Sequence, residues 1–133
     1  MKLKKLIVKK KGWRKLLSKI LIALDESTTC TGYAVFNNGE LIEHGAFSFK
    51  SKDVLERVSF IMEEIEKLIG KYKPNNMIIE DVQITMNAAT AKSLLGLQFM
   101  IEIYAHRNNI QCETIRTTKW RKILGLSNSR TLD

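Results

Sequence analysis

Proline, cysteine and long apolar runs are all scarce in this sequence of 133 residues, and each scarcity excludes a class of protein. One proline and a hydrophobic content of 44% exclude a disordered chain and predict a single folded α/β domain. The two cysteines, Cys30 and Cys112, form no Cys-x-x-Cys pair, which argues against a zinc site or a disulfide framework and for a reducing compartment. No apolar run approaches the ~18–20 residues that span a bilayer, so no membrane span is expected.

Acidic residues are absent from the first 24 positions, where nine lysines and arginines are found. The net charge of +8 therefore comes mainly from this segment, because the remaining positions are close to neutral. A basic arm on a neutral domain suggests a polyanionic partner, nucleic acid first and an anionic membrane surface second. We expect residues 1–19 to form a basic N-terminal extension, either an amphipathic helix or a flexible or misread segment, and residues 20–133 to form the folded domain.

Two short apolar segments that end in acids organise the folded domain. Residues 20–24 precede Asp25, and residues 77–79 precede Glu80. A run of this kind is typical of a strand buried on both faces, and an acid directly after it lies at the strand's carboxyl end. Small residues and a glycine follow Asp25 at 27–32, so backbone or a ligand can come close to it. A solvated turn aspartate is the alternative interpretation.

The strands are predicted from short apolar runs and from the turns between them. An Asn-Asn-Gly turn at 37–39 joins two strand-like runs, which is a strong hairpin signal. The first three strands are expected to form a meander, and the later ones to alternate with helices. The expected strands lie at about 20–25, 32–37, 40–49, 77–80 and 110–116.

Two helices are predicted from apolar residues at three- and four-residue spacing. The first has Ser51 as its expected N-cap and an apolar face from Leu55 to Ile69, which we assign to the core. The second runs from Asn87, its expected N-cap, to about position 106, and its apolar residues cover more than one stripe. One side of this helix could pack on the sheet and another on a partner subunit.

The helix between the third and fourth strands decides where the two acids meet. A strand–helix–strand connection of this length favours a parallel neighbour with a right-handed crossover. If that neighbour is the first strand, Asp25 and Glu80 emerge side by side at one edge of the sheet. Adjacent strands lie ~4.8 Å apart, so the two carboxylates could share a divalent cation. Two anions so close are costly unless a cation or a proton joins them.

Basic residues beside an aromatic follow the last expected strand. Residues 117–125 are expected to form a short helix that carries Lys119, Trp120, Arg121 and Lys122. This placement suits contacts to phosphates. A solvated basic helix whose Trp120 packs on the sheet is an equally good interpretation.

The expected order of elements, with acids closing the first and fourth strands, is similar to the ribonuclease-H-like fold. More narrowly, two stretches within about residues 20–130 resemble the RuvC family of Holliday junction resolvases: LIALDESTTCTGYAVFNNGELIEHG and NNMIIEDVQITMNAATAKSLLGLQFMIEIYAHRNNIQCETIRTTKWRKILG. In that family an Asp-x-Gly or Asp-x-Ser turn is followed by Thr-Gly. Here these motifs are Asp25-Glu26-Ser27 and Thr31-Gly32.

The resemblance implies an endonuclease that uses Mg²⁺, with Mn²⁺ as a substitute metal, and cleaves Holliday or other branched DNA junctions in recombination, DNA repair or phage DNA processing. Asp25 and Glu80 match the acids that bind the metal and act in catalysis in that family. The segment Val82-Gln83-Ile84 corresponds to the part that approaches the junction centre, although the aromatic often found there is absent. DNA contacts are accordingly expected from Gln83, Lys119, Arg121 and Lys122.

The resemblance also implies a homodimer through the 87–106 helix and a cytoplasmic location in a bacterial or phage-infected cell. One departure concerns the metal ligands. The family completes its site with a further one or two acids, or a His and an acid, on a later helix, whereas Asp133 is the only acid from Arg116 onward. We therefore expect a ribonuclease-H-like mixed sheet in a domain that is incomplete at its C-terminus and lacks the final helix.

Two alternatives to this nuclease stay open. The first is a catalytically incomplete, nucleic-acid-binding remnant of the same family, because the further acids are missing. The second is a fragment of an actin-like ATPase or sugar kinase, whose phosphate-binding Asp-x-Gly-Thr-Thr turn is loosely matched by residues 25–29. Proteins of that second class need another domain to enclose a nucleotide.

Overall fold

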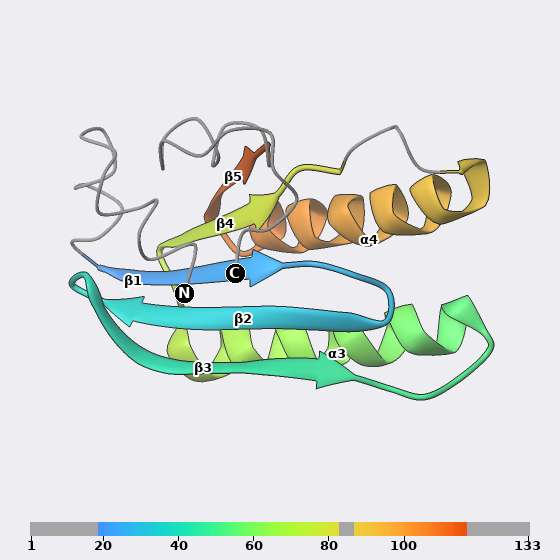
Figure 1. The fold of residues 1–133 in the computed structure, drawn as a ribbon. Coiled ribbons are helices and arrows are strands. Elements are labelled where there is room, and N and C mark those ends of the chain that lie inside the picture. Colours follow the sequence, from blue (N-terminus) through green and yellow to red (C-terminus); the bar gives the residue numbers. More distant parts are fainter. Residues whose placement is uncertain (1–18, 83–86, 117–133) are drawn as a thin grey trace, which may run out of the picture.

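The computed structural model describes residues 19–82 and 87–116, which form a five-stranded mixed sheet and two helices (Figure 1). The strand order across the sheet is β3-β2-β1-β4-β5. In chain order the elements are β1 (Ile20–Asp25), β2 (Cys30–Asn37), β3 (Glu40–Ser48), α3 (Val54–Tyr72), β4 (Asn76–Glu80), α4 (Ala88–Arg107) and β5 (Gln111–Ile115).

The first three strands form the predicted antiparallel meander. The β2–β3 turn places Asn38 and Gly39 at positive φ, 50° and 82°, a conformation that asparagine and glycine tolerate better than other residues. One irregularity interrupts the β2–β3 register, between Val35 and Phe36. The hairpin predicted from the Asn-Asn-Gly turn is therefore confirmed.

The remaining strands add to the other side of β1 in parallel. β4 pairs with β1, so that Ile22 lies opposite Met77 and Leu24 opposite Ile79. β5 then pairs in parallel with β4 at the sheet edge. Helix α3 makes the crossover from β3 to β4. The predicted parallel pairing of the first and fourth strands is thus confirmed.

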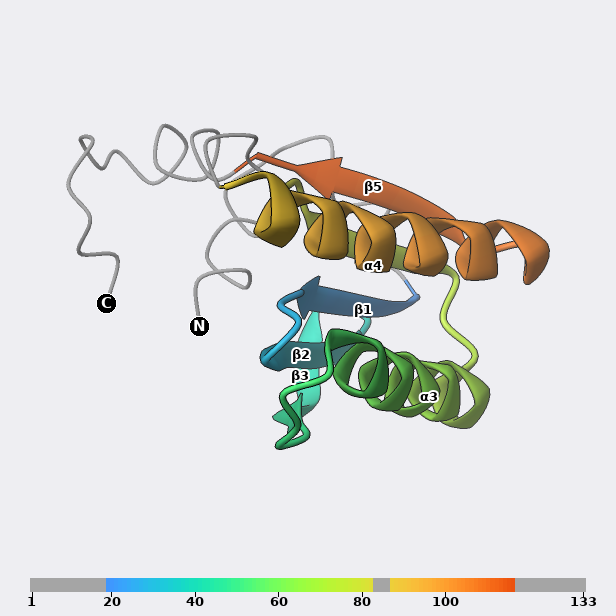
Figure 2. The ribbon, with the colours of Figure 1, turned by 90° about the vertical axis from the view of Figure 1, so that its right-hand side faces the viewer.

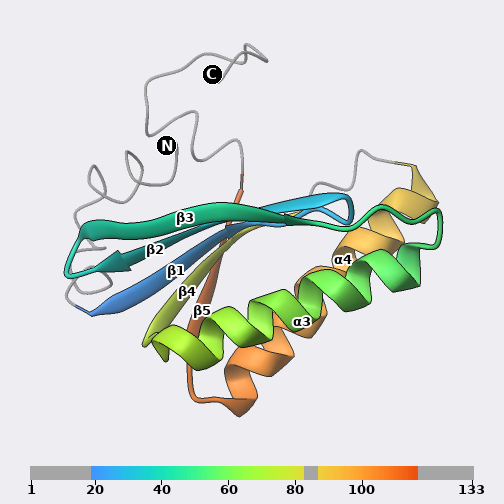
Figure 3. The same ribbon diagram turned by 90° about the horizontal axis from the view of Figure 1, so that it is seen from below.

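Both helices lie side by side on the same face of the sheet (Figures 2 and 3). Between the helices and the sheet is a core of fully buried apolar side chains, and burial of each one larger than alanine stabilises the fold by about 1.5–3 kcal/mol relative to an exposed position. The core side chains with no exposed surface are Ile22, Leu24, Val35, Ile61, Ile65, Met77, Ile79, Leu97, Ile101 and Ala105.

The start of α3 differs from the prediction. Asp53, not Ser51, is the N-cap, and its Oδ1 accepts a hydrogen bond from Leu55 N–H at 2.9 Å. Ser51 Oγ instead accepts from Asp53 N–H at 3.0 Å, so the helix begins two residues later than expected. The assignment of Leu55 to the core is also wrong: this first-turn side chain is 74% exposed. The prediction of Asn87 as the N-cap of α4 is confirmed, since its Oδ1 accepts from Thr90 N–H at 2.9 Å.

Several predictions fall on residues outside those described. They concern the extension at 1–18, Gln83 with its neighbours at 83–86, and the basic segment with Lys119, Arg121 and Lys122. These stay predictions. Neither α3 nor α4 is long and apolar enough to cross a membrane.

Candidate metal centre

The pairing of β1 with β4 brings Asp25 and Glu80 to neighbouring strand ends. Leu24 and Ile79 lie opposite each other in the parallel ladder, and the two acids are the next residues of the two strands. Leu24 and Ile79 belong to the core under the helices. Because side chains alternate along a strand, Asp25 and Glu80 point to the opposite face of the sheet. Two acids 55 positions apart in the chain therefore share one edge and one face.

Gly32 provides space beside Asp25 on the other neighbouring strand. The two residues lie opposite each other in the β1–β2 ladder. A Cβ placed on Gly32 would lie 3.9 Å from the Cβ of Asp25, so any longer side chain would occupy the space next to the carboxylate. The small residues in the turn after Asp25 predicted such an approach.

The turn that follows Asp25 is held by its own side chains. The hydroxyl of the buried Thr31 donates a hydrogen bond to Ser27 O at 2.8 Å. Thr31 Oγ1 also accepts a hydrogen bond from Ser27 N–H at 3.1 Å. Arg57 of α3 adds a second link, because its Nε donates to Thr28 O at 3.0 Å and its Nη1 donates to Ser51 O at 2.7 Å. The turn is therefore fixed to the loop that precedes α3.

Glu26 is a third acid at this edge and was not among the predicted site residues. Its side chain is only 7% exposed, and its Oε2 accepts a hydrogen bond from Glu80 N–H at 3.2 Å. Burial raises the pKa of Glu26 to about 8, and the negative charges of Glu80 and Asp25 add to the rise. Strand alternation could have revealed it, since the residue after Asp25 must turn toward the buried side.

Gln98 of α4 holds the two residues that follow Glu80. This buried side chain accepts from Val82 N–H at 3.1 Å through Oε1, and its Nε2 donates to Glu102 Oε1 at 3.1 Å and to Asp81 Oδ1 at 3.4 Å. Asp81 also forms an ion pair with Arg116 at 3.6 Å. A lone glutamine inside an apolar helix gave no sequence signal of this role.

The donor set at this edge fits one hard divalent cation. Carboxylate oxygens are the ligands that Mg²⁺ prefers, and Mg²⁺ keeps several waters when a protein supplies one or two carboxylates. Within 19–82 and 87–116, no group of three or more His, Cys, Asp or Glu residues is arranged to hold a metal ion. Two carboxylates suit a partly hydrated ion of this kind, and the metal role of Asp25 and Glu80 stays a prediction.

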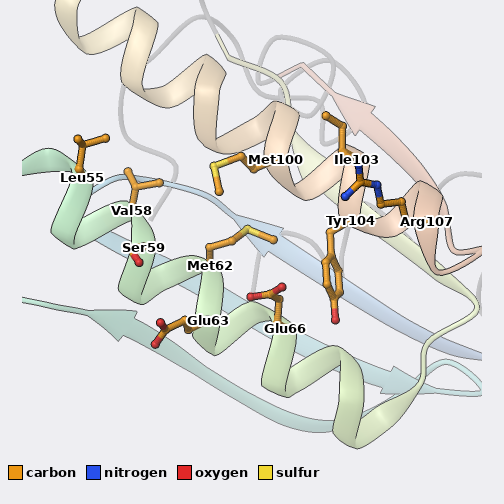
Figure 4. Close-up of a pocket in the computed structure, with 10 residues that line it drawn as sticks. All are labelled: Leu55, Val58, Ser59, Met62, Glu63, Glu66, Met100, Ile103, Tyr104 and Arg107. Carbon is orange, nitrogen blue, oxygen red and sulfur yellow. The ribbon is translucent and has the colours of Figure 1, made fainter.

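Other features of the described chain do not belong to this edge. A groove between α3 and α4 lies on the helix side, away from the face to which Asp25 and Glu80 point (Figure 4).

Burial raises the pKa of Cys112 to about 12, so its thiol stays protonated at neutral pH.

Comparison with known protein families gives a match over most of the sequence. The model of the family described as crossover junction endodeoxyribonuclease RuvC matches residues 21–125. The RuvC of Fusobacterium nucleatum subsp. nucleatum is 31% identical over 96 residues, which cover 68% of this chain and 50% of that protein. The RuvC of Dictyoglomus turgidum is 27% identical over 94 residues, which cover 67% of this chain and 60% of that protein. The chain thus spans 50% to 60% of the length of these two relatives.

Solved structures share the fold. Thermus thermophilus RuvC in complex with a Holliday junction substrate has a TM-score of 0.66 at 14% identity, over 86% of this chain and 84% of that chain. Fowlpox virus resolvase with its substrate Holliday junction DNA has a TM-score of 0.53 at 15% identity, over 74% of this chain and 61% of that chain. These likenesses identify the mixed sheet as ribonuclease-H-like. Since the family model matches residues 21–125, the chain belongs to the RuvC family of crossover junction endodeoxyribonucleases.

Proposed function

We propose that this chain provides the metal-binding core of an endonuclease that cleaves four-way DNA junctions in recombination, DNA repair or phage DNA processing. The observation that supports it most is the β1–β4 register, which sets Asp25 and Glu80 at adjacent strand ends on one face. The family match supports the same assignment. It also removes the support for an actin-like sugar kinase, because residues 25–29 lie inside the matched segment.

In this proposal Asp25 and Glu80 hold a magnesium ion, for which manganese can substitute. A bound divalent ion of this kind activates water and stabilises the leaving oxygen in phosphodiester hydrolysis. Gly32 leaves room for a phosphate or a water beside Asp25, and Thr31 with Arg57 keeps the adjoining turn in place. Cleavage with two ions ~3.5–4 Å apart needs more carboxylates than this pair supplies.

The direct test compares a labelled four-way DNA junction with a linear duplex of the same sequence. We expect the chain to bind the junction at least about tenfold more tightly in Ca²⁺, because a structure-selective enzyme must favour the branched form. Cleavage is then measured in Mg²⁺, for this chain and for a version extended downstream in its own reading frame. Cuts in the junction arms by either version support the proposal.

Two other outcomes would change the assignment. Junction binding without cleavage by either version would favour the catalytically incomplete DNA-binding remnant. Equal affinity for junction and duplex, with no cleavage, would contradict a junction-specific role. Each result is read at one stated salt concentration, since phosphate contacts make affinity strongly salt-dependent.

Phosphate contacts near the acids are proposed for two exposed lysines. Lys50 and Lys52 lie in the loop after β3, the same loop that Arg57 ties to the turn after Asp25. Figure 1 shows that β1 and β3 end on the same side of the molecule. These lysines add to the predicted contacts from Gln83, Lys119, Arg121 and Lys122.

A double Lys50→Gln, Lys52→Gln variant is expected to flatten the salt dependence of junction binding. Each lost phosphate contact reduces the slope of log K against log[salt] by about 0.9, so the slope should fall by about two. The matched control is Lys67→Gln with Lys73→Gln, which removes the same charge near the far end of α3. Equal slopes for the two double variants would rule out a specific role for the 49–53 loop.

We also propose that α4 forms the homodimer interface. Its exposed Leu95, Phe99 and Ile103 recur at four-residue spacing, so they lie on one side of the helix, and Met100 lies next to Phe99 in the chain. Met100 and Ile103 continue from this side into the groove against α3, which is also lined by Leu55 and Met62 (Figure 4). Exposed apolar patches of this kind mark interaction sites. The exposed fractions are 42% for Leu95, 59% for Phe99, 45% for Met100 and 40% for Ile103.

Replacing Phe99 by glutamate is expected to convert a dimer into a monomer, because a charge would be buried without a partner in the contact. Sedimentation velocity or light scattering measures the change. The melting temperature of the variant at low concentration should stay close to that of the parent, since Phe99 is exposed in the single chain. Ile42→Glu on the edge strand β3, where Ile42 is 45% exposed, is the matched control and should stay dimeric. A parent chain that is monomeric at all concentrations would exclude this interface.

A further inference from the structure

Glu26 is a buried carboxyl that the proposed chemistry does not use. It is 7% exposed, although it directly follows the exposed Asp25 in the chain. Burial of a carboxyl costs free energy unless hydrogen bonds compensate for the lost water. An acid in such a position therefore calls for a reason beyond packing.

The contact of Glu26 with Glu80 provides that reason. The β1–β4 ladder pairs residues only as far as Leu24 and Ile79. Glu80 is the next residue after Ile79, and its N–H donates to Glu26 Oε2 at 3.2 Å. This contact joins residues 54 positions apart in the sequence. The side chain thus takes the place of a strand carbonyl and extends the link between the two strands to the residue that carries the second acid.

The same hydrogen bond acts on backbone, not on the carboxylates themselves. Glu26 is joined by its own main chain to Asp25, and by its side chain to the main chain of Glu80. The peptide units that carry Asp25 and Glu80 are therefore held against each other at the open end of the ladder, where strands otherwise fray.

We propose that Glu26 is a positioning residue for the metal site: by accepting from Glu80 N–H it keeps the Asp25 and Glu80 carboxylates at a spacing that one divalent cation can bridge. The inference rests on the proposed metal role of these two acids. Outer residues that orient metal ligands typically change metal affinity by about 10–100-fold when they are replaced.

Two substitutions separate this role from a merely structural one. Glu26→Gln keeps an oxygen acceptor at the same reach, whereas Glu26→Met keeps the length and removes the acceptor. Met removes the cost of burying a carboxyl and also removes the acceptor of Glu80 N–H; these two effects oppose each other, so Glu26→Met is expected to melt close to the parent in EDTA. A merely structural glutamate would instead make stability and metal affinity fall together.

The experiment titrates the full chain and its variants with Mn²⁺ at one pH and follows free Mn²⁺ by its electron paramagnetic resonance signal. We expect Glu26→Gln to bind within about twofold of the parent and Glu26→Met to bind at least about tenfold more weakly, while melting close to the parent in EDTA. Glu64→Gln, on the surface of α3, is the control for a lost carboxylate and should bind like the parent.

The possible results distinguish a failure of the positioning role of Glu26 from a failure of the metal role of Asp25. Parent-like affinity in Glu26→Met would overturn the inference, and so would Glu26→Gln binding as weakly as Glu26→Met, because the charge and not the hydrogen bond would then matter. Asp25→Asn tests the proposed function separately. If that variant binds Mn²⁺ like the parent, the metal role of Asp25 fails. If it loses binding while Glu26→Met does not, only the positioning role fails.

Discussion

An Asp25→Asn variant is expected to be at least as stable as the parent chain in EDTA and less stable than the parent in saturating Mn²⁺. Without metal, the variant lacks one of two like charges that the β1–β4 register sets side by side. With metal, the parent gains RT ln(1 + [Mn²⁺]/Kd), which is about 2.7 kcal/mol at a hundredfold excess over Kd. The variant should gain little, because Glu80 alone is a poor ligand set. Thermal melts in EDTA and in Mn²⁺ measure whether the order of stability of the two chains reverses.

The control for this prediction is a carboxylate far from the site. Glu40 begins β3 at the hairpin, the end of the sheet opposite Asp25, and it is exposed. Glu40→Gln makes the same change in charge and should respond to Mn²⁺ as the parent does. An equal rise in melting temperature for Asp25→Asn and the parent would show that Mn²⁺ binds elsewhere.

The stability of the metal-free chain is expected to fall as the pH rises from about 5 to about 8. Burial raises the pKa of Glu26 from 4.5 to about 8, so the folded chain binds more protons than the unfolded chain between these values. The contribution of the protonated group is fully present below the unfolded value and is lost as the pH passes through the folded value. The slope is at most about 1.4 kcal/mol per pH unit from this group.

Glu26→Gln should remove most of that slope, because glutamine does not titrate. Urea unfolding of the two chains at several pH values between 5 and 8 gives the free energies of unfolding. The difference between them should grow with pH in favour of the variant. If the two curves stay parallel, Glu26 titrates outside this range in the folded chain.

The arrangement of strands could be predicted because local signals and connection rules agreed. Asn38 and Gly39 mark the hairpin through their tolerance of positive φ, and the helix between β3 and β4 imposes a parallel crossover. The adjacency of Asp25 and Glu80 needed one further assumption, that the parallel neighbour of β4 is β1, and the register confirms that pairing. The lengths of the segments and their hydrophobic pattern were enough to predict the meander and the direction of β4.

The details that failed or were missed depend on tertiary contacts. Ser51 and Asp53 are both good N-cap residues; in the structure Asp53 caps the helix, while the Ser51 carbonyl accepts a hydrogen bond from Arg57 Nη1. Leu55 fits the apolar stripe but lies in the first helical turn and is mostly exposed. Glu26 bonds to Glu80, 54 positions away, and Gln98 bonds to Val82, 16 positions away, so no local pattern could name these two partners.

The parallel pairing of β1 and β4 also has a consequence for folding. The ends of a 55-residue segment must close before the two acids become neighbours, and this segment contains two strands and a helix. Closing it costs entropy that the local hairpin does not repay, so contacts of this range form late in many small domains. A partly folded chain with only the meander in place would hold the acids apart. Divalent cation uptake should therefore report completion of the native topology and lag behind the appearance of secondary structure during refolding.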